Sequence, residues 1–452
     1  MKTIDPVLVK RLSGTLALTT ATLSLGFLAA ACQQSTTTSS TPETTTADSV
    51  PATSGATTNV AAGTQALKLG SLLPATGDLG PIGQQMSAAV PLVIEKVNAC
   101  GGVNGAPVTL VAEDDETDPR KGAAAMTKLA NVDRVAGVVG SFASSVSSAA
   151  VPIAVRNKVP LISPGSTSPV FTDRAKKGEF KGFWARTAPP DTYQAEALAQ
   201  LAKKRGFNKV STVVINNDYG VGFEKAFVQT FKKLGGTVVN EGRPTRYDPK
   251  ATTFETEAAA AFAGKPQAVI AVMYEETGSI LLKSAYEQGL MQGVQVMLTD
   301  GVKSATFPGK VGKKDDGKFI VTGAIGTVPG ADGKALAALT QLWKQKKNQA
   351  VGEYVPQAWD ATALLILAAQ AAKANSGEAI AGKLREVANA PGTAVTDVCK
   401  GLELLRKGQD INYQGASGNV DVDANGDVVG VYDVWTVKDD GTLGTIGKVS
   451  PK

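Results

Sequence analysis

Short apolar runs alternate with longer stretches of helical character along the chain from residue 67 onward. In the first half, the apolar runs are rich in leucine, valine and isoleucine, and turn-forming or polar residues follow them. These runs are residues 67–73, 108–112, 135–139 and 159–162. Helical stretches of about a dozen residues separate them, a spacing that predicts parallel strands joined by right-handed crossovers.

A break at residues 184–190 separates this series from a second one of the same kind. The strand-like runs of the second series are residues 210–215, 237–240, 268–273 and 294–298. After a short apolar run at 319–322 the chain is mostly helical to about residue 389, too little for a third α/β domain. The pattern therefore predicts an α/β protein with two wound lobes, one of which the later helices complete.

The C-terminal segment, residues 418–437, contains the run DVDANG at 421–426, which looks like the start of a calcium loop. The twelfth position of that loop would be Tyr432, where a bidentate glutamate is needed. Asn425-Gly426 between two valine-containing runs is typical of a type I′ turn. We expect a β-hairpin here, with a calcium loop as the alternative.

Two serine-rich turns follow neighbouring strands of the first series. Ser144 and Ser145 stand where a helix begins after the strand 135–139, and residues 163–167 (SPGST) follow the strand 159–162. Ligands bind at this edge of an open α/β sheet, and helix N-terminal amides suit a carboxylate or a phosphate. The alternative is that these serines only cap helices.

Composition excludes several classes of function. The 452 residues are 43% hydrophobic, carry a formal net charge of +5 and include no histidine. No block of like charge suggests nucleic-acid binding, and the commonest general base and metal ligand is missing. Neither a dinucleotide-binding glycine motif nor a phosphate-binding P-loop is present. We expect no cofactor, no metal and no nucleic-acid partner.

The N-terminus has the order of a secretory signal, residues 1–31. Basic residues precede an uncharged, largely apolar stretch that stops at Cys32. A cysteine after small residues resembles the lipobox of bacterial lipoproteins, which implies cleavage before Cys32 and a diacylglycerol on its sulfur. Residues 32–66, rich in Ser, Thr and Ala, predict a flexible tether. An uncleaved membrane anchor is the alternative, although the stretch is short for a span.

If Cys32 carries lipid, two cysteines remain, Cys100 and Cys399. In an oxidising compartment, an even pair suggests a disulfide across a very long loop. The alternative is two separate buried thiols.

Several motifs in one order between residue 67 and about residue 437 resemble the periplasmic solute-binding proteins of ABC transporters for branched-chain and other neutral amino acids. The motifs are residues 72–77 (LLPATG), 98–105 (NACGGVNG), 139–145 (VGSFASS), 162–169 (ISPGSTSP) and 412–418 (NYQGASG). The family implies the type I periplasmic binding fold, in which two lobes joined by three crossings clamp a ligand in the cleft between them.

On this resemblance, the crossings fall near Thr187, Thr322 and Gly418. Lobe 1 then comprises residues 67–187 and 323–417, and lobe 2 comprises residues 188–322 and 418–445. The helical segment after Thr322 would return to lobe 1, and the C-terminal hairpin would return to lobe 2.

The resemblance also assigns the ligand contacts of lobe 1. Ser144 matches a serine whose amide and hydroxyl hold the ligand, Thr167 matches the threonine of the second turn, and Ser166 precedes it. Together they would receive an α-carboxylate.

In lobe 2, Tyr219 and Tyr274 match aromatic residues that close over the ligand. Asp300 matches the acidic residue that accepts an α-ammonium group, and charge-assisted hydrogen bonds of this kind are the strong ones. The alternative for Asp300 is a turn residue before Gly301.

The ligand side chain would meet Ile82, Phe142 and Ala143, with Tyr354 over it from the third segment. Each of these residues has an alternative role in the ordinary core, because apolar residues at strand ends usually pack inward.

The family thus implies a monomeric, lipid-anchored periplasmic component of an ABC importer. It would bind a free neutral or branched-chain amino acid and deliver it to a permease with its ATPase subunits, without acting as an enzyme. A binding protein for urea, a short amide or another small carboxylate is the first alternative. A serine-dependent amidase with Ser144 as nucleophile lacks an activating histidine. A sensory receptor on the same fold is a further alternative.

Overall fold

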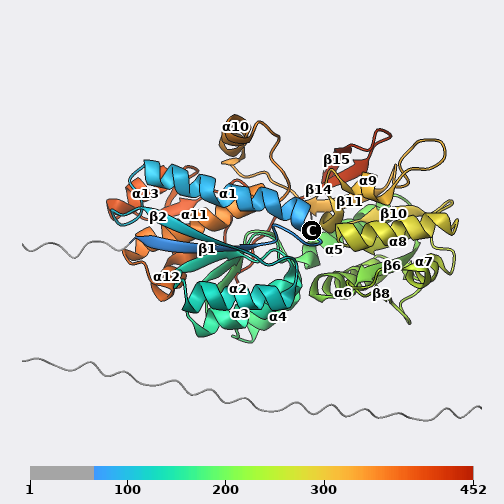
Figure 1. The fold of residues 1–452 in the computed structure, drawn as a ribbon, viewed down its shortest axis with the longest axis horizontal. Coiled ribbons are helices and arrows are strands. Elements are labelled where there is room, and N and C mark those ends of the chain that lie inside the picture. Colours follow the sequence, from blue (N-terminus) through green and yellow to red (C-terminus); the bar gives the residue numbers. More distant parts are fainter. Residues whose placement is uncertain (1–65, 451–452) are drawn as a thin grey trace, which may run out of the picture. The chain divides into compact units, whose positions relative to one another are not determined.

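The computed structural model describes residues 66–450 of the chain. The signal segment predicted at 1–31, the lipid-carrying Cys32 and all but the last residue of the tether predicted at 32–66 lie outside the described residues. Within the described part, two main sheets with helices packed on them form the predicted α/β fold (Figure 1).

The first sheet has five parallel strands in the order β2-β1-β3-β4-β5. These strands are β1 (Leu67–Leu73), β2 (Val108–Asp114), β3 (Gly137–Gly140), β4 (Leu161–Ser163) and β5 (Trp184–Arg186). The strands β1, β3 and β4 are neighbours, so their carboxyl ends meet at one edge of the sheet. The two serine-rich turns follow β3 and β4, and the sheet therefore brings them together as expected.

Helices cover both faces of the first sheet (Figure 1). The helices between its strands are α1 (Gly80–Ala99), α2 (Pro119–Asn131), α3 (Ser144–Arg156) and α4 (Val170–Lys176). Three later helices complete it: α11 (Val355–Ala372), α12 (Gly377–Ala388) and α13 (Val398–Arg406). Near them, β12 (Thr393–Val395) and β13 (Ile411–Tyr413) pair in parallel. The return of the later helices to this sheet makes α11 almost wholly buried.

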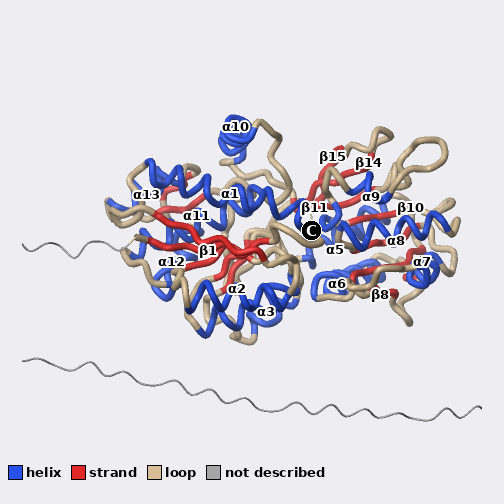
Figure 2. The backbone as a smooth tube through the Cα atoms, viewed as in Figure 1, coloured by secondary structure: helices blue, strands red, loops and turns tan. Residues whose placement is uncertain are grey.

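The second sheet has eight strands, seven in the order β15-β14-β11-β10-β9-β6-β7 and β8 paired with β6. The parallel strands are β6 (Lys209–Ile215), β7 (Thr237–Val238), β8 (Thr245–Tyr247), β9 (Ala268–Val272), β10 (Gln295–Leu298) and β11 (Ile325–Pro329). Two antiparallel strands, β14 (Tyr432–Val437) and β15 (Leu443–Val449), extend its other edge. The tube view in Figure 2 shows the strands of this sheet framed by helices.

The remaining helices follow β5 in the chain, all but α10 before β11. They are α5 (Asp191–Lys204), α6 (Asp218–Lys233), α7 (Glu255–Phe262), α8 (Glu275–Glu287), the 3-10 turn η1 (Asp300–Val302), α9 (Phe307–Val311) and α10 (Leu336–Lys347). α5 packs against α6, and α7 packs against α8.

Apolar patterning and capping account for most of these elements. The central strand β9 is buried along its whole length, which matches the unbroken apolar run that a covered parallel strand needs. α2 begins at Pro119, and the Asp118 carboxylate accepts hydrogen bonds from two free amides of its first turn at 2.7 and 3.2 Å.

The second crossing comes later than the sequence predicted. Phe319 forms only an isolated bridge with Lys313, residues 320–322 form a turn, and the strand is β11, which pairs with β10 in the register Met297↔Ile325. The chain therefore leaves the second sheet after Pro329 and not at Thr322. The prediction was displaced because a short apolar run is compatible with a buried turn as well as with a strand.

The C-terminal hairpin was also misplaced. Residues 418–431 form no strand, and the hairpin pairs β14 with β15 instead. At the predicted turn, the Asp423 carboxylate accepts the Asn425 amide at 2.7 Å. The backbone of Val422 bonds to the Asn389 side chain of α12 at 2.7 and 2.8 Å, so the partners that a strand ladder needs are already used.

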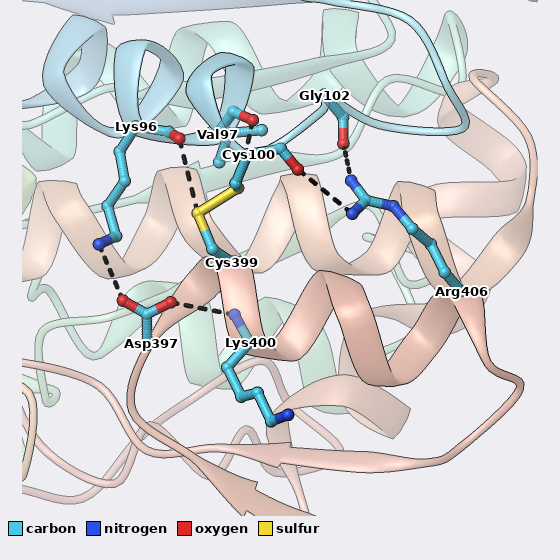
Figure 3. The surroundings of a disulfide bond; sticks show 8 residues. All are labelled: Lys96, Val97, Cys100, Gly102, Asp397, Cys399, Lys400 and Arg406. Carbon is cyan, nitrogen blue, oxygen red and sulfur yellow. Dashed lines mark hydrogen bonds and ion pairs between the residues drawn. A yellow bond between two sulfur atoms is a disulfide. The ribbon is translucent and has the colours of Figure 1, made fainter.

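A disulfide joins Cys100 to Cys399, as predicted, with their Cα atoms 5.9 Å apart. It links the end of α1 to the start of α13, and Figure 3 shows two polar contacts beside it. Lys96 pairs with Asp397 at 2.8 Å, and Arg406 donates to the Gly102 carbonyl at 2.5 Å. Elements almost three hundred residues apart in the chain, at a separation of 299, are thus held together.

Replacing both cysteines by serine should lower the free energy of unfolding by about 2–4 kcal/mol, because the unfolded chain gains the freedom of a very long loop. Thermal unfolding with and without a reductant measures the effect. The wild-type protein should lose stability on reduction, and the double variant should not respond. Equal melting temperatures for oxidised and reduced wild type would contradict a stabilising disulfide.

Candidate ligand-binding site

The two serine-rich turns of the first sheet are joined by a buried network of hydroxyl groups. The Ser166 hydroxyl lies 2.8 Å from Ser147 Oγ and 3.0 Å from the Phe142 carbonyl. The Ser163 hydroxyl donates to the Ser141 carbonyl at 2.5 Å. Gly140, before this network, has φ 144°, and a Cβ there would lie 2.2 Å from the Leu72 carbonyl oxygen. The network fixes the two turns against each other.

The same turns leave donors free on the other side. Ser144 begins α3 without capping it, and its Oγ accepts the Ser168 amide at 3.2 Å, which leaves the hydroxyl proton available. The Thr167 hydroxyl is buried, lies near the Asp191 carboxylate and makes no well-formed hydrogen bond in residues 66–450. The first amides of α3 have no acceptor within their own helix. These groups are suited to an anion such as a carboxylate.

The facing half of the site comes from the second sheet. Tyr219 follows β6, Tyr274 follows β9 and Asp300 follows β10, and these three strands are neighbours. The rings of Tyr219 and Tyr274 stack with centroids 5.6 Å apart and an interplanar angle of 10°. The Asn217 side chain accepts the Gly220 amide at 3.0 Å, starts α6 there and so places Tyr219 in its first turn.

Asp300 receives hydrogen bonds from three segments of the chain. The Tyr354 hydroxyl donates to Oδ2 at 2.8 Å, and the Gln194 amide donates to Oδ1 at 2.8 Å. The Tyr219 hydroxyl lies 3.0 Å from Oδ1. The carboxylate is buried and tightly oriented, although hydroxyl and amide donors bring it no positive charge.

A narrow, nearly closed cavity lies between the two halves. The residues that line it are Leu79, Phe142, Ala143, Ser144, Gly165, Thr167, Tyr219, Tyr274, Asp300 and Gly301. Seven of the predicted ligand-binding residues are among these lining residues. The Phe142 ring packs on Gly165, where a Cβ would lie 2.0 Å from the ring, and it meets Tyr354 edge-on at 4.7 Å.

Three predicted ligand contacts do not line the cavity. The Ser166 hydroxyl is hydrogen-bonded within the serine network. Ile82 packs in the core, where it is 5% exposed. Tyr354 acts on the site through its bond to Asp300 and its ring contact with Phe142. The side chains of Ser166 and Ile82 turn to the interior of the first half, and their contact with a ligand stays a prediction.

Two polar residues of the site were missed from the sequence. Asp191 begins α5 directly after Pro190, and Gln194 lies on the same face of that helix. Neither carboxylate oxygen of Asp191 has a well-formed hydrogen bond in residues 66–450, although the residue is fully buried. The sequence offered only an acidic residue in a first helical turn, which is the ordinary favourable placement.

Asp191 and Asp300 form a buried pair of like charges. Burial raises the pKa of Asp191 well above its usual value, and repulsion from Asp300 adds to this, while Thr167 and Arg186 oppose it. Burial also raises the pKa of Asp300 against the effect of its hydrogen-bond donors. A buried charge needs a partner, so this corner of the cavity is suited to a cation.

Contacts across the cavity hold the two halves closed. The Asp78 carboxylate, from the loop before α1, accepts the Glu276 amide at 2.6 Å and the Thr277 hydroxyl at 3.1 Å. It thereby caps α8, which has no capping side chain of its own. The Ser168 hydroxyl donates to the Asp218 carbonyl at 2.8 Å.

Larger hollows elsewhere in residues 66–450 lack a comparable set of buried polar groups facing a ligand. One beside α6 is lined largely by charged side chains. Both of its glutamates are paired, Glu224 with Arg246 at 2.9 Å and Glu241 with Lys232 at 2.7 Å. Among the described residues, no cluster of His, Cys, Asp or Glu is arranged to hold a metal ion. No helix within residues 66–450 has the length and apolar content to cross a membrane.

Residues 85–440 match the sequence profile of the receptor family ligand binding region, over well more than half of the chain. The chain belongs to this family. A similar curated member is the chemotactic signal transduction system substrate-binding protein BasB of Halobacterium salinarum, 27% identical over 389 residues, 83% of this chain and 88% of that protein. The Leu/Ile/Val-binding protein homolog 1 of Brucella abortus is 28% identical over 320 residues, 70% of this chain and 81% of that protein.

Solved structures show the same fold. The leucine-binding protein LivK from Thermotoga maritima superimposes with a TM-score of 0.71 at 24% identity, covering 85% of this chain and 99% of that one. LivJ from Streptococcus pneumoniae, in complex with isoleucine, gives 0.69 at 20% identity, with coverages of 86% and 100%. A solute-binding protein from R. palustris, in complex with benzoate, gives 0.67 at 19% identity, with coverages of 86% and 97%. The predicted type I periplasmic binding fold is confirmed.

Replacing Asp78 by alanine should weaken ligand binding by about 0.5–2 kcal/mol, the usual effect of losing a helix cap, because this cap exists only when the halves are closed. Calorimetry gives the affinity, and small-angle scattering gives the radius of gyration of the ligand-free protein, which should increase. The matched control is Asp397→Ala, which removes a cap from α13 inside one half and should leave affinity unchanged. Equal losses in both variants would contradict a closing role for Asp78.

Proposed function

We propose that this chain is the substrate-binding component of an ABC importer and that it carries a free neutral α-amino acid. The observation that supports this most is the placement of two chemically opposite groups across one small cavity. Hydroxyl and amide donors lie on the first half, and the buried Asp300 carboxylate, which no lysine or arginine pairs with in residues 66–450, lies on the other half. A zwitterion satisfies both.

The α-carboxylate would lie against Ser144 and Thr167. The Thr167 hydroxyl makes no well-formed hydrogen bond among the described residues, and the start of α3 supplies amides with the positive end of the helix dipole. Neither group requires a side-chain cation, which fits a ligand whose own ammonium balances its charge.

The α-ammonium would lie against Asp300, with Asp191 contributing a second negative charge. Asp300 is held in place by Tyr219, Tyr354 and Gln194, so it is oriented before the ligand arrives. An ammonium group between the two carboxylates removes their mutual repulsion.

The ligand side chain would meet Leu79, Phe142, Ala143 and the ring of Tyr274. Asp300 is the one charged residue in the cavity lining. An apolar wall of this kind favours a neutral side chain and rejects a charged one by desolvation. The neighbours named for leucine and isoleucine agree with this class of ligand.

Binding would close one half on the other, with the ligand stabilising the closed form by hinge motion. The closed protein would then deliver its cargo to a permease with ATPase subunits. We also propose a monomer, anchored through lipid on Cys32 in the periplasm. These last features rest on the sequence.

Two other functions are less well supported by the cavity. A simple carboxylate such as benzoate, the ligand named for one structural neighbour, would satisfy Ser144 and Thr167 but would be repelled by Asp191 and Asp300. Urea or a short amide would leave these carboxylates without a cation. A sensory role, as in the name of BasB, would use the same binding step.

Replacing Asp300 by asparagine should weaken amino-acid binding by about 2–5 kcal/mol, because the charge that partners the ammonium is lost while the shape is kept. Calorimetry with leucine, alanine and isocaproate separates the contributions, since isocaproate lacks the ammonium group and should bind weakly to both proteins. The control is Asp315→Asn, at an exposed position away from the cavity. Near-native leucine affinity in the Asp300 variant would contradict the assignment of Asp300 as the partner of the ammonium group.

Amino-acid binding should release protons at mildly acidic pH. The ligand-free pKa values of Asp191 and Asp300 are raised, and a bound ammonium lowers them, so between the two values binding displaces protons. Affinity should therefore fall as the pH falls through that window. Calorimetry in buffers of different ionisation enthalpy counts the protons, and Asp191→Asn should reduce the count. A pH-independent affinity with no proton release would rule out the raised carboxylate pair.

A further inference from the structure

Arg186 is a fully buried arginine at the end of β5, directly before the first crossing. Its Nε donates to Asp427 Oδ1 at 2.8 Å, and its Nη2 lies 2.8 Å from both Asp427 and the Thr172 hydroxyl. The Thr172 hydroxyl in turn donates to the other oxygen of Asp427 at 2.7 Å. The planar guanidinium is thus paired with the Asp427 carboxylate and held in one orientation by Asp427 and Thr172.

The remaining nitrogen of Arg186 holds the second serine-rich turn. Nη1 donates to the Ser166 carbonyl at 2.9 Å and to the Ser168 carbonyl at 3.0 Å. The carbonyl between them, that of Thr167, accepts the Asp191 amide at 2.8 Å. The carbonyl groups of residues 166–168 are therefore all held by hydrogen bonds, and Thr167 lines the cavity.

The partner of Arg186 comes from the far end of the chain. Asp427 closes the turn of residues 423–427, the run that resembles a calcium loop in the sequence, and lies 241 residues from Arg186. The Gly426 carbonyl also accepts the Arg186 amide at 2.9 Å. A Cβ on Gly426 would lie 2.5 Å from the Trp184 carbonyl oxygen, so only glycine allows this approach. The acidic turn therefore packs on the end of β5 and bonds to Arg186.

We propose that Arg186 and Asp427 are positioning residues for the ligand carboxylate, which act through the backbone of residues 166–168. The guanidinium orients Thr167, and Asp427 orients the guanidinium. Because β5 and the turn 423–427 belong to crossing segments of the hinge, the carboxylate site keeps one geometry while the halves move. This inference rests on the proposed function, since it assigns how an amino-acid carboxylate is recognised.

A purely structural brace would behave differently from a positioning pair. Loss of a brace lowers the melting temperature and weakens every ligand equally. Loss of a positioning pair removes the selectivity for a carboxylate, because Thr167 no longer points at it, and leaves the ammonium contacts of Asp300 intact. The decisive quantity is therefore the ratio of affinities for leucine and for leucinol, which keeps the ammonium and side chain but has no carboxylate.

The experiment compares wild type, Arg186→Lys, Asp427→Asn and the double variant by calorimetry with leucine and leucinol. Lysine keeps the charge but cannot span both carbonyls and Asp427 at once. The leucine-to-leucinol ratio should fall by roughly tenfold or more in each single variant, the scale of hydrogen bonds to a charged group, with leucinol affinity nearly unchanged. The double variant should lose no more than the worse single variant, because the two residues act in series.

Arg174→Lys is the matched control, since Arg174 pairs with Glu179 at 2.7 Å on the exposed side of α4 and should not alter the ratio. If the Arg186 variant does not fold, Asp427→Asn and Thr172→Val carry the same test. Unchanged ratios in the variants would overturn the positioning role while the proposed function stands. A wild-type protein that binds no amino acid, or binds leucinol as well as leucine, would overturn the proposed function and this inference with it.

Discussion

Two buried carboxylates close to each other set the terms for the whole binding site. Asp191 and Asp300 lie within each other's field, and the Arg186 guanidinium offsets only part of the charge of Asp191. No lysine or arginine pairs with Asp300 in residues 66–450. Folding tolerates such a pair only while protons or an external cation offset the repulsion. The positive charge therefore has to come with the ligand, and this requirement explains why both residues are so closely surrounded by polar, uncharged neighbours.

The remaining geometry of the site follows from parallel strands ending at the same edge. In the first sheet, β3 and β4 deliver donors without charge, and in the second sheet, β6, β9 and β10 deliver two tyrosines and Asp300. Neither set recognises a zwitterion alone. Asp78 and Ser168 make contacts that exist only when the two sets face each other. Ligand affinity and closure are for this reason two measurements of one equilibrium.

The crossing segments carry more of the chemistry than hinges usually do. The pair of Arg186 with Asp427 joins the end of β5 to the turn 423–427, and Arg186 also holds the second serine-rich turn. Asp360, buried in α11, performs a similar task for the NYQGASG motif, where its carboxylate accepts the Tyr413 hydroxyl at 2.9 Å and the Ser417 amide at 2.7 Å. The residues that hold the proposed hinge and those that hold the proposed site are therefore largely the same. A substitution that alters the hinge should also alter ligand binding.

Local sequence determined the wound α/β architecture and the two serine-rich turns, because apolar periodicity and turn residues act over short distances. The expected cysteine pair followed from the number of cysteines and not from local pattern. Local sequence misplaced the second crossing and the hairpin, since an apolar run such as 319–322 serves a turn as well as a strand. It also missed Asp191 and Arg186, which look like an ordinary helix start and strand end. Only the tertiary structure decided their roles, because the effect of a buried charge depends on its neighbours. Those neighbours are Asp300 for Asp191 and Asp427 for Arg186, and they come from distant parts of the chain.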